Sequence, residues 1–107
     1  MGNGPGILQP AEKLVRDRVP DIMRSRGCSV RVRIVTGVEL DLMLRRKIVE
    51  EAYELEQSGD IEEIADLLEA VSRLLDIRGV SPAEIDQIRE QKRKSRGGFD
   101  QGLVMSI

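Results

Sequence analysis

The sequence predicts an all-α fold, in which a helical hairpin assembles by oligomerisation into a four-helix bundle. Three observations support this prediction. Apolar residues recur at helical spacing over most of the chain after residue 36, and three positions carry helix-start signals. With 40% hydrophobic and only 2% aromatic residues, the core must be aliphatic. A chain of 107 residues also gains buried apolar area by association.

The start signals predict three helices, at 37–57, 61–78 and 82–95. Each follows a residue that can cap the first turn, with a glutamate three positions later. The link at Gly59 and Asp60 is so short that the first two helices must form an antiparallel hairpin. The capping pairs are Thr36 with Glu39, Asp60 with Glu63, and Ser81 with Glu84, where Pro82 takes the first helical position.

The segment before these helices is predicted to be a short helix over 11–27. Pro20 interrupts it and starts a further turn, which Gly27 ends. The Gly- and Pro-rich residues 1–10 are expected to form a flexible tail, followed by a single helical domain over 11–107.

Two segments have the pattern of β-strands. "SVRVRIV", residues 29–35, places Val and Ile at alternate positions, as a strand with one buried face does. One strand cannot satisfy its own backbone groups, and the C-terminal "GLVMSI", residues 102–107, is the other candidate. We therefore expect a small two-stranded ribbon beside the helices.

Composition excludes several classes of function. The 17 basic and 19 acidic residues nearly balance, so no overall field favours a nucleic-acid polymer. The absence of histidine removes Ser-His-Asp and Cys-His nucleophile systems and histidine-bearing zinc sites. A single cysteine, Cys28, fits a reducing compartment. Without a membrane-spanning run or a signal pattern, we expect a cytoplasmic protein with no membrane partner.

Several acidic residues of the predicted hairpin lie beside its apolar stripes. On the first helix Glu51 falls inside the stripe and Glu54 at its margin. On the second helix Glu63 lies at the edge of the stripe and Asp66 further round. Because the chain reverses at Gly59, Glu54 is expected to meet Glu63 near the turn. Glu51 and Asp66 are expected roughly one turn further along their helices.

Four converging carboxylates would need compensation, because clustered like charges raise one another's pKa. A divalent cation with oxygen ligands provides it, and Mg²⁺ or Mn²⁺ suits this ligand set. The alternative is that these are ordinary helix residues, with Glu63 closing a cap and Glu51 paired with Lys47. The same offset of three residues on both helices favours the metal site.

The acid pattern resembles that of a known family. "EEAYE", residues 50–54, and "EIAD", residues 63–66, are similar to the paired signature of the MazG-like all-α nucleoside-triphosphate pyrophosphohydrolases, Glu-Glu-x-x-Glu and Glu-x-x-Asp. "KLVRDRVPDI", "ADLLEAV" and "KRKSRGGFDQG" resemble the small house-cleaning branch of that superfamily. The likeness spans residues 12–103. The chain departs from longer relatives in its short interhelical connection and its few aromatic residues.

The resemblance implies Mg²⁺-dependent cleavage between the α and β phosphates of a nucleoside triphosphate, which yields the monophosphate and pyrophosphate. It also implies a homodimer or homotetramer with sites near the subunit boundary. Glu50 matches the motif but turns away from the site on the helical wheel, so we expect it to have a supporting role. By the same resemblance, the catalytic and metal-binding residues are Glu51, Glu54, Glu63 and Asp66.

Basic residues beyond the acids would bind the phosphates, and the resemblance points to two segments. In the first, two cations three residues apart share a helical face, with an aspartate that could orient one of them. In the second, cations precede two glycines whose backbone N–H groups can approach an anion. A helix C-terminus whose cations favour its dipole is the alternative for the second segment. The expected substrate-binding residues are Lys13, Arg16, Asp17, Lys92, Arg93, Arg96, Gly97 and Gly98.

Two other functions fit the same acids. Phosphoribosyl-ATP pyrophosphohydrolase of histidine biosynthesis shares the acid pattern, but it matches "KLVRD" and "RGGFD" less well. A helical dimerisation or metal-sensing module would bind a cation at these residues without turnover. Release of pyrophosphate from nucleotides separates the enzymes from the module.

Overall fold

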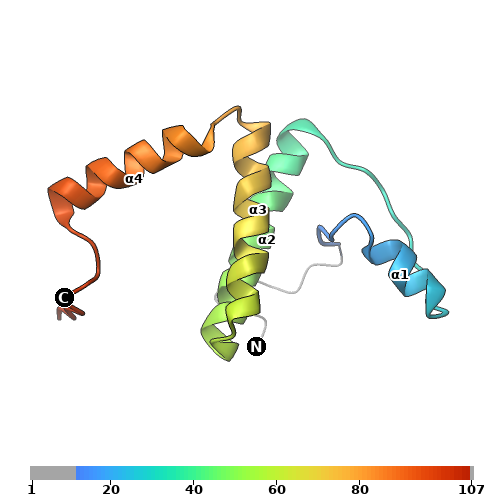
Figure 1. Ribbon diagram of the computed structural model, residues 1–107. Coiled ribbons are helices and arrows are strands. Elements are labelled where there is room, and N and C mark those ends of the chain that lie inside the picture. The colour runs from blue at the N-terminus through green and yellow to red at the C-terminus, as the bar shows by residue number, and fades with distance from the viewer. Residues whose placement is uncertain (1–11, 107) are drawn as a thin grey trace.

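The structure is a computed structural model that describes residues 12–106. This part of the chain contains four helices joined by non-helical segments (Figure 1). The prediction of an all-α fold is confirmed, and the three long helices begin and end within one residue of their predicted bounds. None of the described helices has the length and apolar character needed to cross a membrane. The helices are α1 at Val19–Ser25, α2 at Gly37–Ser58, α3 at Ile61–Ile77 and α4 at Pro82–Arg96.

The predicted caps form at only one of the three helix starts. Ser81 Oγ accepts a hydrogen bond from the backbone N–H of Glu84 at 3.1 Å, as predicted. Thr36 and Asp60 stand at the N-cap positions of α2 and α3, but their side chains accept no capping hydrogen bond. At α3 the reason is that the N–H of Glu63 donates to the backbone carbonyl of Asp60, at 3.1 Å.

Helices α2 and α3 form the predicted antiparallel hairpin, and they are the pair that packs extensively among the described helices (Figure 1). Gly59 ends α2 with φ 68°, a backbone conformation that favours glycine. Its N–H donates to the carbonyl of Leu55 at 2.8 Å. At the other end, Arg78 after α3 donates two hydrogen bonds to Asp41 of α2, at 2.7 and 2.9 Å. Both ends of the hairpin are therefore fixed.

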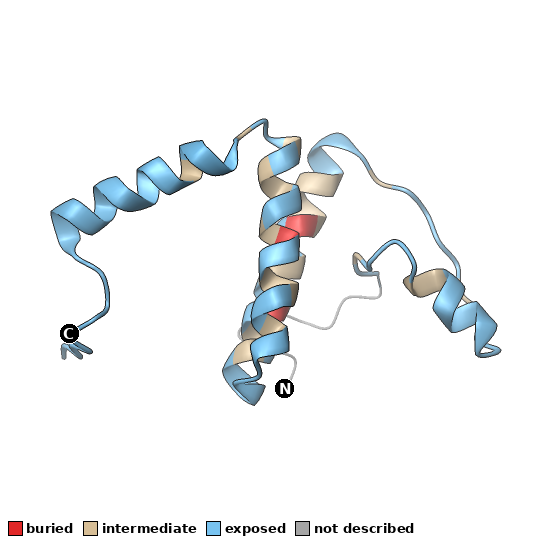
Figure 2. Cartoon of the chain, in the orientation of Figure 1, coloured by how far each residue is buried: buried red, intermediate tan, exposed pale blue. Residues whose placement is uncertain are grey.

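The interior of the hairpin is small (Figure 2). Leu44 and Ala70 are the only buried apolar residues in the described part of the chain, and Glu51 is the only buried charged one. On α3, Ile64 and Leu68 lie four residues apart and are 41% and 59% exposed. Since 40% of the sequence is hydrophobic, a single chain covers little of its apolar surface.

Helices α1 and α4 extend away from the hairpin on opposite sides (Figure 1). The radius of gyration is 17.0 Å, whereas a compact domain of this length has about 13 Å. One chain therefore supplies two packed helices. A four-helix bundle needs a second hairpin, and the assembly stays a prediction.

The predicted ribbon is wrong for the residues that the structure describes. Neither residues 29–35 nor residues 102–106 form a strand, and Ile107 lies outside the described range. The two segments lie on opposite sides of the hairpin, so they cannot pair (Figure 1). The alternating residues 29–35 form instead an extended link between α1 and α2.

The predicted helix before Pro20 is also wrong. Residues 12–18 contain no helix, whereas the further turn predicted to start at Pro20 is confirmed as α1, with Pro20 in its first turn. Lys13 and Arg16 form ion pairs with acids of the hairpin, which draw this segment across α2 and α3. The residues before it, including the predicted tail at 1–10, lie outside the described range.

Candidate metal centre

Three carboxylates come together where α2 faces α3. One oxygen atom from each of Glu51, Glu63 and Asp66 lies within 4.8 Å of the others. Glu51 is only 8% exposed, and the other two are half-buried. The spacing of three residues puts Glu63 and Asp66 on one face of α3, and antiparallel packing brings Glu51 opposite them. These are three of the four acids predicted from the sequence.

The fourth predicted acid, Glu54, stands outside this group. It is exposed, and it does not belong to the carboxylates that lie within 4.8 Å of one another. Glu54 lies three residues closer than Glu51 to the turn at Gly59 and about 60° round the helix from it. Its charge still acts on Glu63, whose pKa it helps to raise.

The electrostatics of the cluster appear most clearly at Glu63. Burial is the largest cause that raises its pKa above the ordinary 4.5. The charges of Glu51, Glu54 and Asp66 raise this pKa further, as does a hydrogen bond with Glu51. Without a cation, the ionised form of Glu63 is therefore less favourable than that of a free glutamate. A dication among these oxygens would remove the repulsion.

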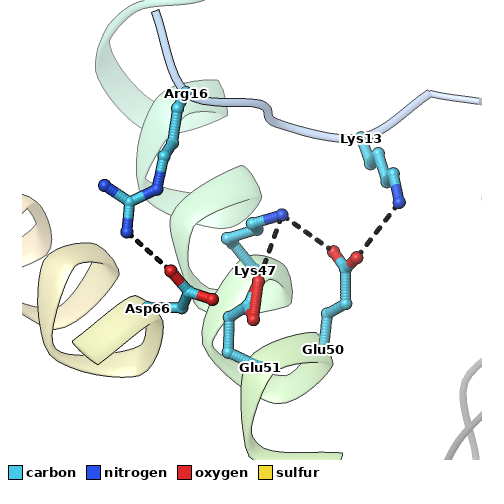
Figure 3. A network of polar contacts seen from close by, with 6 residues as sticks. All are labelled: Lys13, Arg16, Lys47, Glu50, Glu51 and Asp66. Atoms are coloured by element: carbon cyan, nitrogen blue, oxygen red, sulfur yellow. Dashed lines mark hydrogen bonds and ion pairs between the residues drawn. The ribbon is translucent and has the colours of Figure 1, made fainter. Parts of the chain in front are cut away.

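Lys47 is a residue of the site that the sequence analysis placed only in an alternative ion pair. Its Nζ lies 3.3 Å from Glu51 Oε2 and 3.4 Å from Glu50 Oε1, and its side chain is half-buried (Figure 3). The spacing of four residues between Lys47 and Glu51 was the available signal. Glu51 therefore forms the ion pair with Lys47 and also lies close to the other acids, so the two alternatives predicted from the sequence occur together.

The first predicted phosphate-binding segment borders the acids. Arg16 Nη2 lies 2.7 Å from Asp66 Oδ1, and Lys13 Nζ lies 3.2 Å from Glu50 Oε2. Figure 3 shows the two basic side chains reaching the acids from one stretch of chain that passes over the helices. Asp17 is exposed and forms no ion pair within the described residues, so its predicted pairing with Arg16 is not observed.

The second predicted phosphate-binding segment lies at the far end of α4, away from the acids of its own chain (Figure 1). Arg93 Nη2 forms an ion pair with Asp100 Oδ2 at 3.2 Å. A Cβ at Gly98 would lie 2.9 Å from Arg93 Nη1, so glycine permits this close approach. An open pocket at this end of α4 is lined by Arg93, Arg96 and residues 97–103. Lys92 is not part of this lining.

The carboxylates fit a hard divalent cation. Mg²⁺ and Mn²⁺ prefer carboxylate oxygens and keep several water ligands, so three protein oxygens leave positions open. No histidine or cysteine takes part, which disfavours zinc and copper. Lys47 and Arg16 lie close enough to orient the carboxylates or to compete with the cation for them.

Comparison of the chain with models of protein families, with curated protein sequences and with solved structures finds no match in any of the three. The resemblance to the MazG-like family therefore rests on the sequence segments themselves. It stays a hypothesis about the function of the acids on α2 and α3.

Proposed function

We propose that the chain is a Mg²⁺-dependent nucleoside-triphosphate pyrophosphohydrolase that removes damaged or non-standard nucleotides. The observation that carries the proposal is the group Glu51, Glu63 and Asp66, whose oxygens lie within 4.8 Å of one another on two packed helices. Arg16 and Lys13 at the border of this group add the positive charge that a triphosphate needs. The sequence resemblance implies that the bond cleaved is the one between the α and β phosphates.

Each group has a role in this proposal. Glu51, Glu63 and Asp66 hold the ion, and Glu54 is a further acid at the edge of the cluster. Mg²⁺, or Mn²⁺ in its place, neutralises phosphate charge and acidifies water when bound. A carboxylate of the cluster accepts a proton from the attacking water. The water oxygen bonds to phosphorus while the bridging P–O bond breaks, which releases monophosphate and pyrophosphate.

The proposal includes a homo-oligomer, either a dimer or a tetramer. The exposed apolar face of α3, with Ile64 and Leu68, and the extended shape of one chain support it. Two hairpins packed together would form the predicted four-helix bundle. In such an assembly, Arg93 and Arg96 of one chain would serve the acids of another, because the end of α4 that carries them extends away from α2 and α3 of its own chain (Figure 1).

The experiment that tests the activity measures pyrophosphate release from a panel of nucleotides, with Mg²⁺ and with a chelator. The panel contains standard and damaged nucleoside triphosphates together with phosphoribosyl-ATP. We expect Mg²⁺-dependent release, strongest for a damaged or non-standard triphosphate. Strongest release from phosphoribosyl-ATP would favour the histidine-biosynthesis enzyme instead.

Substitution of the acids tests the site. Glu51→Gln and Asp66→Asn should each lower pyrophosphate release by roughly a hundredfold or more, because each removes a charged ligand or a proton acceptor. Glu62→Gln is the matched control, since Glu62 is exposed on the same helix as Asp66. If both site variants keep wild-type turnover and Mg²⁺ affinity, the site is assigned to the wrong residues.

A second function, a metal-binding and dimerisation module without catalysis, is favoured by one observation. Within one chain, the end of α4 that carries Arg93 and Arg96 extends away from α2 and α3, so the acids lack part of the positive charge that catalysis on a triphosphate would use (Figure 1). This module would bind Mg²⁺ with the same residues and release no pyrophosphate from any nucleotide of the panel. Calorimetric binding of Mg²⁺ combined with an inactive panel would select it.

A further inference from the structure

Residues 12–18, named here the strap, are attached to the hairpin by acids of the candidate metal centre. Arg16 Nη2 lies 2.7 Å from Asp66 Oδ1, and Lys13 Nζ lies 3.2 Å from Glu50 Oε2 (Figure 3). Residues 13–16 of the strap have no regular secondary structure, and its end joins α1 through hydrogen bonds from the Val19 N–H to the Arg16 carbonyl and from the Ile22 N–H to the Arg18 carbonyl, both at 3.0 Å. The two ion pairs hold the middle part of the strap against the acids of α2 and α3.

Both ion pairs are weak enough to exchange. The side chains of Arg16 and Asp66 are 55% and 41% exposed, and water screens charges at such positions. Ion pairs of this kind contribute little to stability because water and salt compete for both partners. A bound dication, with twice the charge of a guanidinium, would displace Arg16 from Asp66.

The start of the strap has a separate anchor. Arg33 donates to Glu12 at 2.9 Å and to Glu39 of α2 at 2.6 Å. These residues take no part in the acid cluster, so this attachment persists when the ion pairs of Arg16 and Lys13 break. The strap is therefore held at its start by Arg33 and at its end by α1, so release concerns its middle part, residues 13–16.

We propose that the strap closes over the acids when no cation is bound, and that a divalent cation releases it. Release frees Arg16 and Lys13 to bind the phosphate groups of an anionic ligand. The order of binding is then cation first and polyphosphate second. This inference rests on the proposed function of the acids as a Mg²⁺ site, and it adds a regulated step to that site.

The direction in which Arg16→Gln changes Mg²⁺ affinity distinguishes competition by Arg16 from a simpler role as a positioning residue. If Arg16 only orients Asp66, then Arg16→Gln weakens Mg²⁺ binding. If Arg16 competes with the cation for Asp66, the same variant tightens Mg²⁺ binding. An exposed ion pair of this kind corresponds to a change of roughly two- to fivefold.

Isothermal calorimetry with Mg²⁺ alone provides the first test. We expect Arg16→Gln to lower the dissociation constant roughly two- to fivefold. Arg18→Gln is the matched control, because Arg18 is exposed and forms no ion pair within the described residues. In Mg²⁺-saturated protein, Arg16→Gln should bind inorganic pyrophosphate more weakly than the control does.

A distance measurement provides the second test. Spin labels are attached at Asp17→Cys in the strap and Glu69→Cys on α3, with Cys28→Ser as background, and labelled chains are diluted into unlabelled ones. We expect Mg²⁺ to broaden and lengthen the distance distribution, and Arg16→Gln to do so without Mg²⁺. The charge swap of Arg16→Asp with Asp66→Arg should restore the closed distance, and Mg²⁺ should not change it.

Several outcomes overturn the inference. An unchanged distance in protein that binds Mg²⁺ shows that the strap is not released, and weaker Mg²⁺ binding by Arg16→Gln shows that Arg16 only orients Asp66. The proposed function can stand in either case. Release of the strap by Mg²⁺ without any nucleotide hydrolysis supports the inference and rejects the enzyme. Absence of Mg²⁺ binding rejects both.

Discussion

Glu51 lies almost wholly out of water although it carries a carboxylate. Burying a charge is unfavourable unless a partner compensates it, and Lys47 on the preceding turn is that partner. Glu63 and Asp66 bring two further negative charges to the same place. Lys47 and Arg16 bring two positive charges against these three carboxylates, so the cluster retains a negative charge that favours binding of a further cation.

Replacing Glu63 should reveal the repulsion in the cluster. Burial and the charges of Glu51, Glu54 and Asp66 raise the pKa of Glu63 above 4.5. Its ionised form is therefore destabilised in the folded state, and the penalty disappears as pH falls through the raised pKa. Glu63→Gln should stabilise the metal-free protein at pH 7, and this advantage over the wild type should vanish on acidification toward about 4.5. Urea unfolding of both proteins in the presence of a chelator, at a series of pH values, measures this difference in stability.

The control for this experiment is Glu62→Gln, because Glu62 precedes Glu63 on α3 and is exposed. It should change the unfolding midpoint little, and by the same amount at every pH. A stability difference between Glu63→Gln and the wild type that stays constant from pH 7 to acid would contradict the assigned origin of the shift.

Individual site residues could be predicted where helical geometry alone decides their position. The helical wheel placed Glu51, Glu63 and Asp66 on the facing sides of two helices, and the structure brings them together. The helical wheel could not predict two other features of the site. The place of Glu54 outside the group depends on how closely α2 packs on α3, and the contact of Arg16 with Asp66 joins residues 50 positions apart.

Among the elements, helices with local signals were predicted best. Apolar periodicity and the breaks at Gly59 and Ser81 fix the bounds of α2, α3 and α4, because helical hydrogen bonds join near neighbours. Residues 12–18 and 29–35 were assigned wrongly because their conformation depends on distant partners. Ion pairs to the hairpin hold the first, and the second has no strand beside it.

The Asp41–Arg78 contact should stabilise the open end of the hairpin. Two hydrogen bonds from Arg78, and then one from Arg45, lower the pKa of Asp41 from 3.8 to about 2. A depressed pKa means that this stabilisation is present above 3.8 and is lost as pH falls through about 2. Asp41→Asn should lower the urea midpoint at pH 7, and its difference from the wild type should disappear near pH 2.

Asp76→Asn provides the comparison for Asp41→Asn. Asp76 is exposed near the end of α3 and forms no ion pair within the described residues. Its replacement should leave the pH dependence of the urea midpoint unchanged. Equal effects of the two variants would show that the contact with Arg78 contributes nothing specific.

At the scale of the whole molecule, the chain has more apolar surface than one hairpin can cover. Leu44 and Ala70 are its only buried apolar residues among those described, while large apolar side chains on α3 remain in contact with water. The sequence predicted the hairpin and a need for association. It did not predict the outward course of α1 and α4, because few contacts within the chain fix where they lie.

Association through α3 is the corresponding prediction. We expect the wild type to sediment as a dimer or tetramer, and Ile64→Lys to dissociate it because the new charge would enter an apolar interface. Sedimentation equilibrium in a reducing buffer measures the mass and excludes cross-links through the exposed Cys28. Glu69→Lys adds a lysine at an exposed position of the same helix and should leave the mass unchanged. A monomeric wild type would refute this assembly.

The burial of Glu51 beside two other acids also affects how long the folded chain survives. A ligand that binds only the native state adds to its free energy of unfolding by mass action. Proteases attack chains that have opened, at a rate set by how often they open. Digestion should therefore proceed faster in a chelating solution than in one rich in magnesium, so mineral supply would control the lifetime of the protein as well as its chemistry.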